Sequence, residues 1–479
     1  MTIVSTLITP IAAEFDSMTL LSWFASAYFI PSAATQPLAG KLTDIYSRRT
    51  GLIFCYILFG TGCLLCGLAR NQAVMIAGRA LSGAGGGPMN AISTFICSDL
   101  LPLRRRGLWQ GMGNIIFGVG MSLGGLVGGS LHDTWGWRYA FLLQVPFTIA
   151  SGLLVFFLVK IPVKKTEVSA LERVDFLGAG LITLSLLLLL VGLNSGGNQV
   201  PWSHPLVVTV LPLSVVCFLA FIYVEDKIAL EPIIPVRLFL HRTVFSACIT
   251  NMLSMMTTYV YHFYIPYFIQ MKGATATQAG LRFIPHAVAS SVGSFASGLA
   301  MRLTGRYYLT SCLGMLSYVM GSAFICTLTF SSPAWQTYLY LVLVGLGLGT
   351  MLTVTLVAMI AAVDVKDQAV VTSASYAFRT TGSTMGITVA SAVFQNWLNR
   401  SLAQALVNLP QAEEIIEAIR DDYHKIAALP TAALRYEAKE SYLGAFRAAF
   451  VTALITVVLA SLASLCMKEH KLHKTLTRK

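Results

Sequence analysis

The sequence predicts an all-α integral membrane protein with fourteen spans. Hydrophobic residues make up 56% of the 479 residues, charged residues only 11%, and the mean hydropathy is +0.70. A water-soluble domain could carry this composition only by exposing apolar surface. Long apolar stretches, most of them close to the ~20 residues needed to cross a bilayer, recur along the chain. Basic residues fall on alternate connections between these stretches, which indicates a defined orientation in a membrane.

The apolar stretches form a group of six, a pair and a second group of six. We therefore expect an N-terminal six-helix bundle over 1–160, a linker with two extra transmembrane helices over 161–242, and a C-terminal six-helix bundle over 243–479 that includes a long outer loop and a tail. The predicted spans are 2–15, 21–39, 51–69, 74–97, 108–131, 139–159, 176–193, 206–224, 244–269, 280–301, 308–330, 335–363, 373–398 and 442–467.

The first predicted span, 2–15, is shorter than the others. It gives about 21 Å of helix at 1.5 Å per residue, against a hydrocarbon core of about 30 Å. We expect the natural chain to begin upstream and to supply the rest of this truncated helix. A signal peptide is the competing interpretation, but this stretch has no basic segment before it and no small-residue cleavage site after it, both of which are typical of such peptides.

The connections rich in Lys and Arg are expected on the cytoplasmic side of the membrane. Because the number of spans is even, both termini lie on the same side as these connections and are predicted to be cytoplasmic. The outer loop 399–441 is polar and charged, with apolar residues at helical spacing, Ile415, Ile416 and Ile419. A solvated or interfacial helix fits this spacing better than a binding domain.

Composition and motifs argue against several classes of function. The net charge of +12 comes from Lys and Arg dispersed at helix ends, without the continuous basic groove that binds nucleic acid. We find no phosphate-binding loop and no cluster of nucleophile, base or metal ligands in the sequence, so we expect no enzyme, metal or cofactor. Cys63 and Cys66, which form a Cys-x-x-Cys pair, are interpreted as helix packing. The expected partners are the lipid bilayer, a small organic or cationic solute and protons, with the protein a monomer.

A motif lies between the second and third spans, Gly40-Lys-Leu-Thr-Asp44-Ile-Tyr-Ser-Arg48-Arg49. It resembles the signature of the major facilitator superfamily, with a serine in place of the second glycine. The spacing predicts a tight turn in which Asp44 sits near a helix N-terminus or an arginine and forms a conformational switch. The same spacing recurs between the second and third spans of the C-terminal half, as two related halves predict. The resemblance implies two six-helix bundles that alternate access to a central cavity.

The fourth and fifth spans extend the resemblance. Arg79 lies in an otherwise apolar helix, where a charge costs at least ~2.5 kcal/mol, so we expect it to face the bundle interior or a water-filled cavity. Snorkelling to the outer interface is the alternative, and the resemblance implies a role in proton transfer. Glycines in the fifth span permit close helix packing and resemble the antiporter motif of the fourteen-span drug:proton antiporter family, without its proline. These glycines are Gly120, Gly124, Gly125, Gly128 and Gly129.

Later motifs narrow the branch. Trp137-Arg-Tyr-Ala-Phe141 matches the start of the sixth span in the same antiporter family, and Ser375-Tyr-Ala-Phe-Arg379 in the C-terminal half looks most like a fungal branch. That branch contains vacuolar basic amino acid transporters and multidrug exporters.

A proton-coupled carrier needs a titratable group within the membrane. The acidic residues of this sequence fall in connections or at span ends. The coupling acid would then lie in the missing part of the first helix, or His262 would titrate in its place. Candidates for the substrate cavity, where aromatic and polar groups could hold an organic cation, are Asn114, Asn251, Tyr259, Tyr261, His262 and Tyr264. A packed aromatic core with a hydrogen-bonded histidine is the alternative.

Together these features predict a secondary transporter that moves drugs, toxins or other small organic solutes by proton antiport. The alternatives are a vacuolar basic amino acid transporter and a truncated relative that does not transport. The expected location is the vacuolar or plasma membrane.

Overall fold

The computed structural model describes residues 2–15, 21–100, 103–159, 175–196, 200–228, 241–364, 368–407, 412–421 and 423–470. Helices account for nearly all of these residues. The N-terminal group comprises α1 (Thr2–Glu14), α2 (Leu21–Ile45), α3 (Arg48–Gly67), α4 (Gln72–Leu100), α5 (Leu103–Trp135), α6 (Trp137–Leu142) and α7 (Gln144–Leu158). The next two helices are α8 (Phe176–Ser195) and α9 (Pro205–Lys227). The C-terminal group comprises α11 (Arg242–Met271), α12 (Ala276–Leu281), α13 (Ile284–Thr304), α14 (Tyr308–Ile325), α15 (Ala334–Ala362), α16 (Gln368–Ala405), α17 (Ala412–Asp421), the 3₁₀ turn η2 (Tyr423–Ala428) and α18 (Ala432–Leu465).

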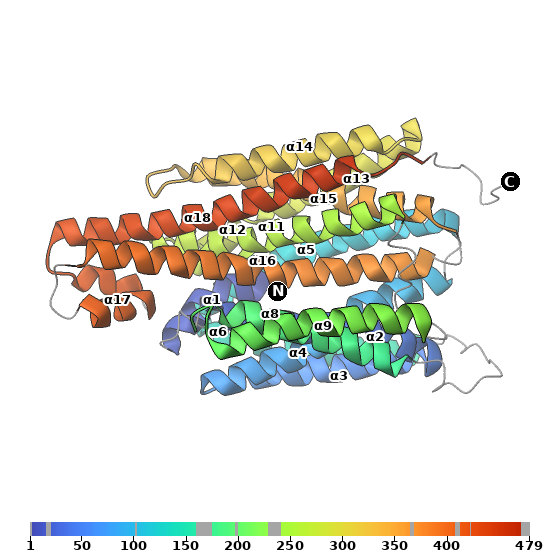
Figure 1. The fold of residues 1–479 in the computed structure, drawn as a ribbon, viewed down its shortest axis with the longest axis horizontal. Helices are drawn as coiled ribbons and strands as arrows, with labels where there is room; N and C mark the ends of the chain where they lie inside the picture. The colour runs from blue at the N-terminus through green and yellow to red at the C-terminus, as the bar shows by residue number, and fades with distance from the viewer. Residues whose placement is uncertain are drawn as a thin grey trace.

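The long helices run along one axis of the molecule (Figure 1). Each predicted span falls on a helix or on two consecutive helices, and the all-α membrane architecture is confirmed. Within the described chain, 7 helices are long and apolar enough to cross a membrane on their own, with α8, α9 and α18 among them. Phe147, Phe157 and Leu309 are 67%, 65% and 69% exposed. Such an apolar surface suits contact with lipid.

Local chemistry fixes where helices begin and end. Ser47 caps α3 because its hydroxyl accepts hydrogen bonds from the backbone N–H groups of Arg49 and Thr50. Thr275 and Gln278 form a reciprocal capping box at the start of α12. Gly305 ends α13 in the left-handed conformation, with φ +69°, which glycine adopts without strain.

Two groups of helices pack against each other. The N-terminal group meets the C-terminal group where α2 packs on α16, where α5 packs on α12 and α13, and where α1 packs on α11. We refer to these groups as the two halves. The helices α8 and α9 pack against each other, and α8 also packs against α2 and α16. The hydroxyl of Thr183 on α8 donates to the Ala34 carbonyl of α2 at 3.1 Å. The pair therefore lies beside one of the contacts between the halves.

The α17 end of the molecule lies opposite the end at which α18 finishes (Figure 1). In α17 the residues Ile416 and Ile419 are buried, and the side chains of Glu414 and Glu417 are exposed. The Ile419 carbonyl accepts a hydrogen bond from the Tyr442 hydroxyl at 2.8 Å. The helix expected in this loop is thus present, and its apolar face packs on the bundle.

Candidate functional site

A buried polar cluster joins α11, α15 and α16. Arg379 Nε donates to Asn251 Oδ1 at 2.9 Å, and Arg379 Nη2 donates to the Leu352 carbonyl at 3.3 Å. Asn251 is 0% exposed, and its amide also contacts the hydroxyls of Ser375 and Thr355, each at 3.2 Å. The cluster places a cation deep in the C-terminal half. Asn251 was predicted from its position in a span, whereas Arg379 was noted only as part of a family motif.

A second buried cation, Arg79, lies in the N-terminal half. Its side chain is 4% exposed, Nε donates to the Phe24 carbonyl of α2 at 3.2 Å, and the guanidinium lies 4.6 Å from the centre of the Tyr28 ring. Arg79 therefore points into the bundle, toward α2, rather than toward the helix end. A cation over an aromatic face is stabilised by the charge distribution of the ring.

His262 lies beside a second histidine. Its ring centre is 5.4 Å from that of His286 on α13 and 5.7 Å from that of Tyr259. His262 Nδ1 lies 2.8 Å from the Thr258 carbonyl, and His286 Nδ1 lies 3.2 Å from the Leu341 carbonyl. Because carbonyls only accept, Nδ1 carries the proton in both rings. His286 Nε2 is buried and has no hydrogen-bond partner in the described chain.

His286 was not among the predicted site residues. The available signal was a titratable residue inside the predicted span 280–301, the same signal that selected His262. The sequence could not show that the two rings meet, because their helices come together only in the folded bundle.

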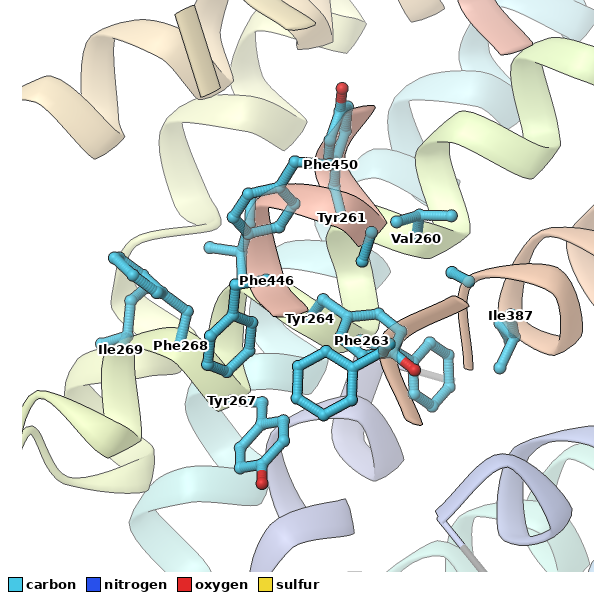
Figure 2. Close-up of a cluster of buried hydrophobic side chains, with 14 of the residues drawn as sticks. Val260, Tyr261, Phe263, Tyr264, Tyr267, Phe268, Ile269, Ile387, Phe446 and Phe450 are labelled. Atoms are coloured by element: carbon cyan, nitrogen blue, oxygen red, sulfur yellow. The ribbon is translucent and has the colours of Figure 1, made fainter. Parts of the chain in front are cut away.

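The three candidate tyrosines of α11 point in different directions. The ring of Tyr259 meets Phe29 of α2 edge to face at 4.9 Å, which places it at the contact between the halves. Tyr261 and Tyr264 are 1% and 2% exposed and lie in an aromatic cluster that α18 completes with Phe446 and Phe450 (Figure 2). Tyr264 also stacks at a tilt on Phe394 at 5.2 Å. Among the described ring contacts of these three tyrosines, the one with the N-terminal half is that of Tyr259 with Phe29.

The predicted glycines of α5 differ in what they face: some pack against α12, one packs against α1, and one has no neighbour close to its Cβ position. A Cβ on Gly129 would lie 2.6 Å from backbone atoms of Thr277, and a Cβ on Gly128 would lie 3.1 Å from the Cα of Ile3 on α1. Gly125 lies against Gly280, on which a Cβ would meet the Gly125 carbonyl at 2.3 Å. A Cβ on Gly120 would meet nothing within 4 Å, and Gly124 is partly exposed. Gly125 and Gly129 are therefore the predicted glycines that allow the backbones of the two halves to touch.

Polar contacts reinforce this junction at the α17 end. Asp133 Oδ2 on α5 accepts hydrogen bonds from both the backbone N–H and the hydroxyl of Thr277 on α12. Gln270 Nε2 on α11 donates to the Thr6 carbonyl of α1 at 3.1 Å. Along the other junction, the Thr380 hydroxyl donates to Gln36 Oε1 at 2.8 Å. The halves thus meet through glycine backbones and through hydrogen bonds in which at most one partner carries a charge.

The predicted conformational-switch motif spans the connection from α2 to α3. Arg48 Nη1 donates to the Thr43 hydroxyl at 2.8 Å, and the Arg49 guanidinium lies 4.2 Å from the centre of the Phe156 ring on α7. Gly40 and Asp44 fall on the last turns of α2, but the surroundings of both positions lie outside the described part of the chain. The side chain of Asn114 on α5 also lies outside it.

An ion pair joins α1 to α6 at the α17 end. Arg138 Nη2 lies 2.7 Å from Glu14 Oε1, and it also donates to the Ala69 carbonyl at 3.0 Å. Trp137 Nε1 donates to the other oxygen of Glu14. The Trp137-Arg138 motif therefore links the start of α6 to the end of α1 and to the residues that follow α3.

The described residues contain no group of three or more His, Cys, Asp or Glu side chains that could hold a metal ion. Cys63 and Cys66 are both buried. The Cys66 thiol contacts the Met75 carbonyl of α4 at 3.8 Å, so it lies in the packing of α3 on α4.

Cations inside helix bundles with apolar surfaces mark substrate or ion pathways, which indicates a polytopic membrane transporter. Comparison with known proteins gives the family. The chain belongs to the Major Facilitator Superfamily, whose family model matches residues 1–387. The resemblance drawn from the sequence motifs is confirmed.

Relatives and a solved structure agree with this assignment. The chain is 36% identical to "Multidrug resistance protein fnx1" of Schizosaccharomyces pombe, over 100% of this chain and 91% of the relative. It is 34% identical to "Vacuolar membrane amino acid uptake transporter fnx2" of the same yeast, over 98% and 82%. The fold matches a bacterial homolog of the human lysosomal transporter Spinster, in an inward-facing and unoccupied conformation, with TM-score 0.66, 15% identity and coverage of 97% and 93%.

Proposed function

We propose that this transporter exchanges small organic solutes for protons by alternating access, through rocking of the two halves. Drug-like compounds are the primary candidate substrates and basic amino acids are the alternative, in line with the names of its relatives. The proposed location is the vacuolar or plasma membrane, with both termini cytoplasmic. We also infer a monomer without enzymatic activity.

The junction of α5 with α12 carries this proposal. Gly129 lies against the backbone of Thr277, and Gly280 lies against the backbone of Gly125. Contacts of this kind form between bare helix faces and bury few side chains, so they can separate without large repacking. Rocking of two repeats around a central site is the motion that this architecture favours. The halves can thus close and reopen at the α17 end.

We propose Arg79 and His262 as proton-coupling groups, and we add His286 because its ring lies beside that of His262. No acidic side chain is classed as buried in the described parts of the two halves, whereas Glu225 on α9 is 5% exposed. The neighbouring imidazoles of His262 and His286 are therefore the neutral bases available inside the C-terminal half. Histidine suits this role because its ordinary pKa lies near 6.5.

Reconstitution into sealed vesicles tests the proposal. The purified chain would be given an imposed pH gradient, an internal pH indicator, and arginine, lysine or tetraphenylphosphonium in turn. Solute-dependent dissipation of the gradient is expected, and empty vesicles provide the background. Solute movement without a pH change would contradict proton exchange, and silence toward every solute would favour the non-transporting alternative.

A further inference from the structure

We propose that Arg379 is the anchor for a carboxylate on the transported solute, so that the substrates are amino acids or other small organic acids. This inference rests on the proposed function, because it assigns the substrate class of the same transport site. It favours the amino acid alternative over a purely cationic drug.

The guanidinium of Arg379 is held in place but is not saturated. An arginine side chain offers five N–H donors. In the described chain one is used by Asn251 Oδ1 and one by the Leu352 carbonyl, which leaves three. Nη1 forms no hydrogen bond to a described residue, and the side chain keeps partial exposure. The free edge of the guanidinium can therefore accept a planar, two-oxygen ligand.

No counter-ion from the described residues neutralises this cation. Arg379 forms no ion pair with a described carboxylate. Its charged or titratable neighbours in that part of the chain are Tyr376, whose ring centre lies 5.3 Å away, and Cys248, and neither carries a carboxylate. A charge at this depth is costly to hold without a partner, and such residues mark substrate or ion pathways. A carboxylate ligand would supply the missing negative charge.

The position of Arg379 suits a substrate site. It lies about 16 Å along α16 from Gln368, at ~1.5 Å per residue. The next residue, Thr380, contacts Gln36 of α2, so this stretch of α16 lies at the junction of the halves. Asn251 on α11 holds the guanidinium through its hydrogen bond with Nε. Arg379 is partly exposed, whereas Arg79 is 4% exposed and lies over the Tyr28 ring.

Matched pairs of solutes test the proposal. Vesicles containing the full chain would be assayed with arginine against agmatine and with lysine against cadaverine, each pair differing by one carboxylate. At low concentration, arginine is expected to be transported at least about 10-fold faster than agmatine, and lysine at least about 10-fold faster than cadaverine. Removing one partner of a buried charge pair weakens binding by at least that factor. Arg379→Gln is expected to abolish this preference, and Arg379→Lys to restore part of it.

The outcomes separate this inference from the proposed function. Arg400→Gln, an exposed arginine later on the same helix, is the control and should keep the preference. Residual transport of agmatine or cadaverine by Arg379→Gln would show that the variant is folded. Equal transport of both members of each pair by the unmodified protein, or a preference that survives in Arg379→Gln, would overturn the assignment while leaving transport intact. Silence toward all four solutes would count against both proposals.

Discussion

Asp133 at the end of α5 holds the backbone of Thr277, which belongs to the other half of the protein. The same carboxylate oxygen accepts from the Thr277 amide and from its hydroxyl. Four residues earlier on α5, Gly129 lies against the same Thr277. Closure at the α17 end therefore combines a charge-assisted hydrogen bond with a backbone contact, and each can be removed separately.

Removing the carboxylate should loosen this end. In Asp133→Ala the amide and hydroxyl of Thr277 lose their acceptor, so α12 should open more often. We expect hydrogen exchange of the amides in α12 to accelerate several-fold, as judged by mass spectrometry of the protein in detergent or nanodiscs. Glu440→Ala, an exposed carboxylate on α18, is the control. Unchanged exchange in Asp133→Ala would mean that the contact contributes nothing to closure.

A methyl group added to α5 where it contacts α12 should prevent the two halves from closing at the α17 end. In Gly129→Ala the new Cβ would lie 2.6 Å from backbone atoms of Thr277, which cannot move without displacing α12. Overpacking of this kind costs about 1–3 kcal/mol. The closed state should therefore be disfavoured, and the initial rate of transport in vesicles should fall at least about 5-fold.

The matched control lies on the same helix. Gly120→Ala places its Cβ within 4 Å of nothing, so transport should persist. Alanine is a better helix former than glycine by about 0.5–1 kcal/mol, so the melting temperature should not fall. Equal rates in the two variants would remove the role given to Gly129.

The sequence predicted the positions of the helices well because their length and apolarity are local properties. It also selected α5 as a packing helix from its glycines. Which helices pack against the glycines of α5 could be seen only in the folded structure. The repeat of Gly120, Gly124 and Gly128 every four residues suggests one continuous face, whereas Gly125 and Gly129 meet the other half and Gly128 meets α1. Glycine spacing reports a bare face but not which helix covers it.

The candidate site was harder to predict for the same reason. Arg379 meets Asn251 across 128 residues of sequence, and His262 meets His286 on a different helix. The tyrosines at 259, 261 and 264 looked alike as a cluster, yet Tyr259 contacts α2 and the other two fill the aromatic core. Residue type identified the groups capable of chemistry, and only tertiary packing decided which of them come together.

Arg79 provides a test of the N-terminal half. In Arg79→Ala the contacts with the Phe24 carbonyl and the Tyr28 ring are lost, so α4 should be held less firmly against α2. We expect transport to be abolished while the protein still reaches the membrane, and the same for Asp44→Asn in the switch motif. Transport assays with surface-expression controls check both variants. Uptake at the rate of the unmodified protein in either one would contradict the role assigned to that residue.

His262 provides the test of proton coupling. His262→Gln keeps a hydrogen-bonding side chain but cannot bind a proton at neutral pH, and His286→Gln makes the same change in the neighbouring ring. If these imidazoles carry the coupled proton, transport driven by a pH gradient should be lost, whereas exchange of labelled for unlabelled solute across the membrane should continue. His241→Gln, an exposed histidine before α11, should retain both activities. Loss of both activities in His262→Gln would instead indicate that the ring is needed for packing, and retention of both would leave the coupling to another group.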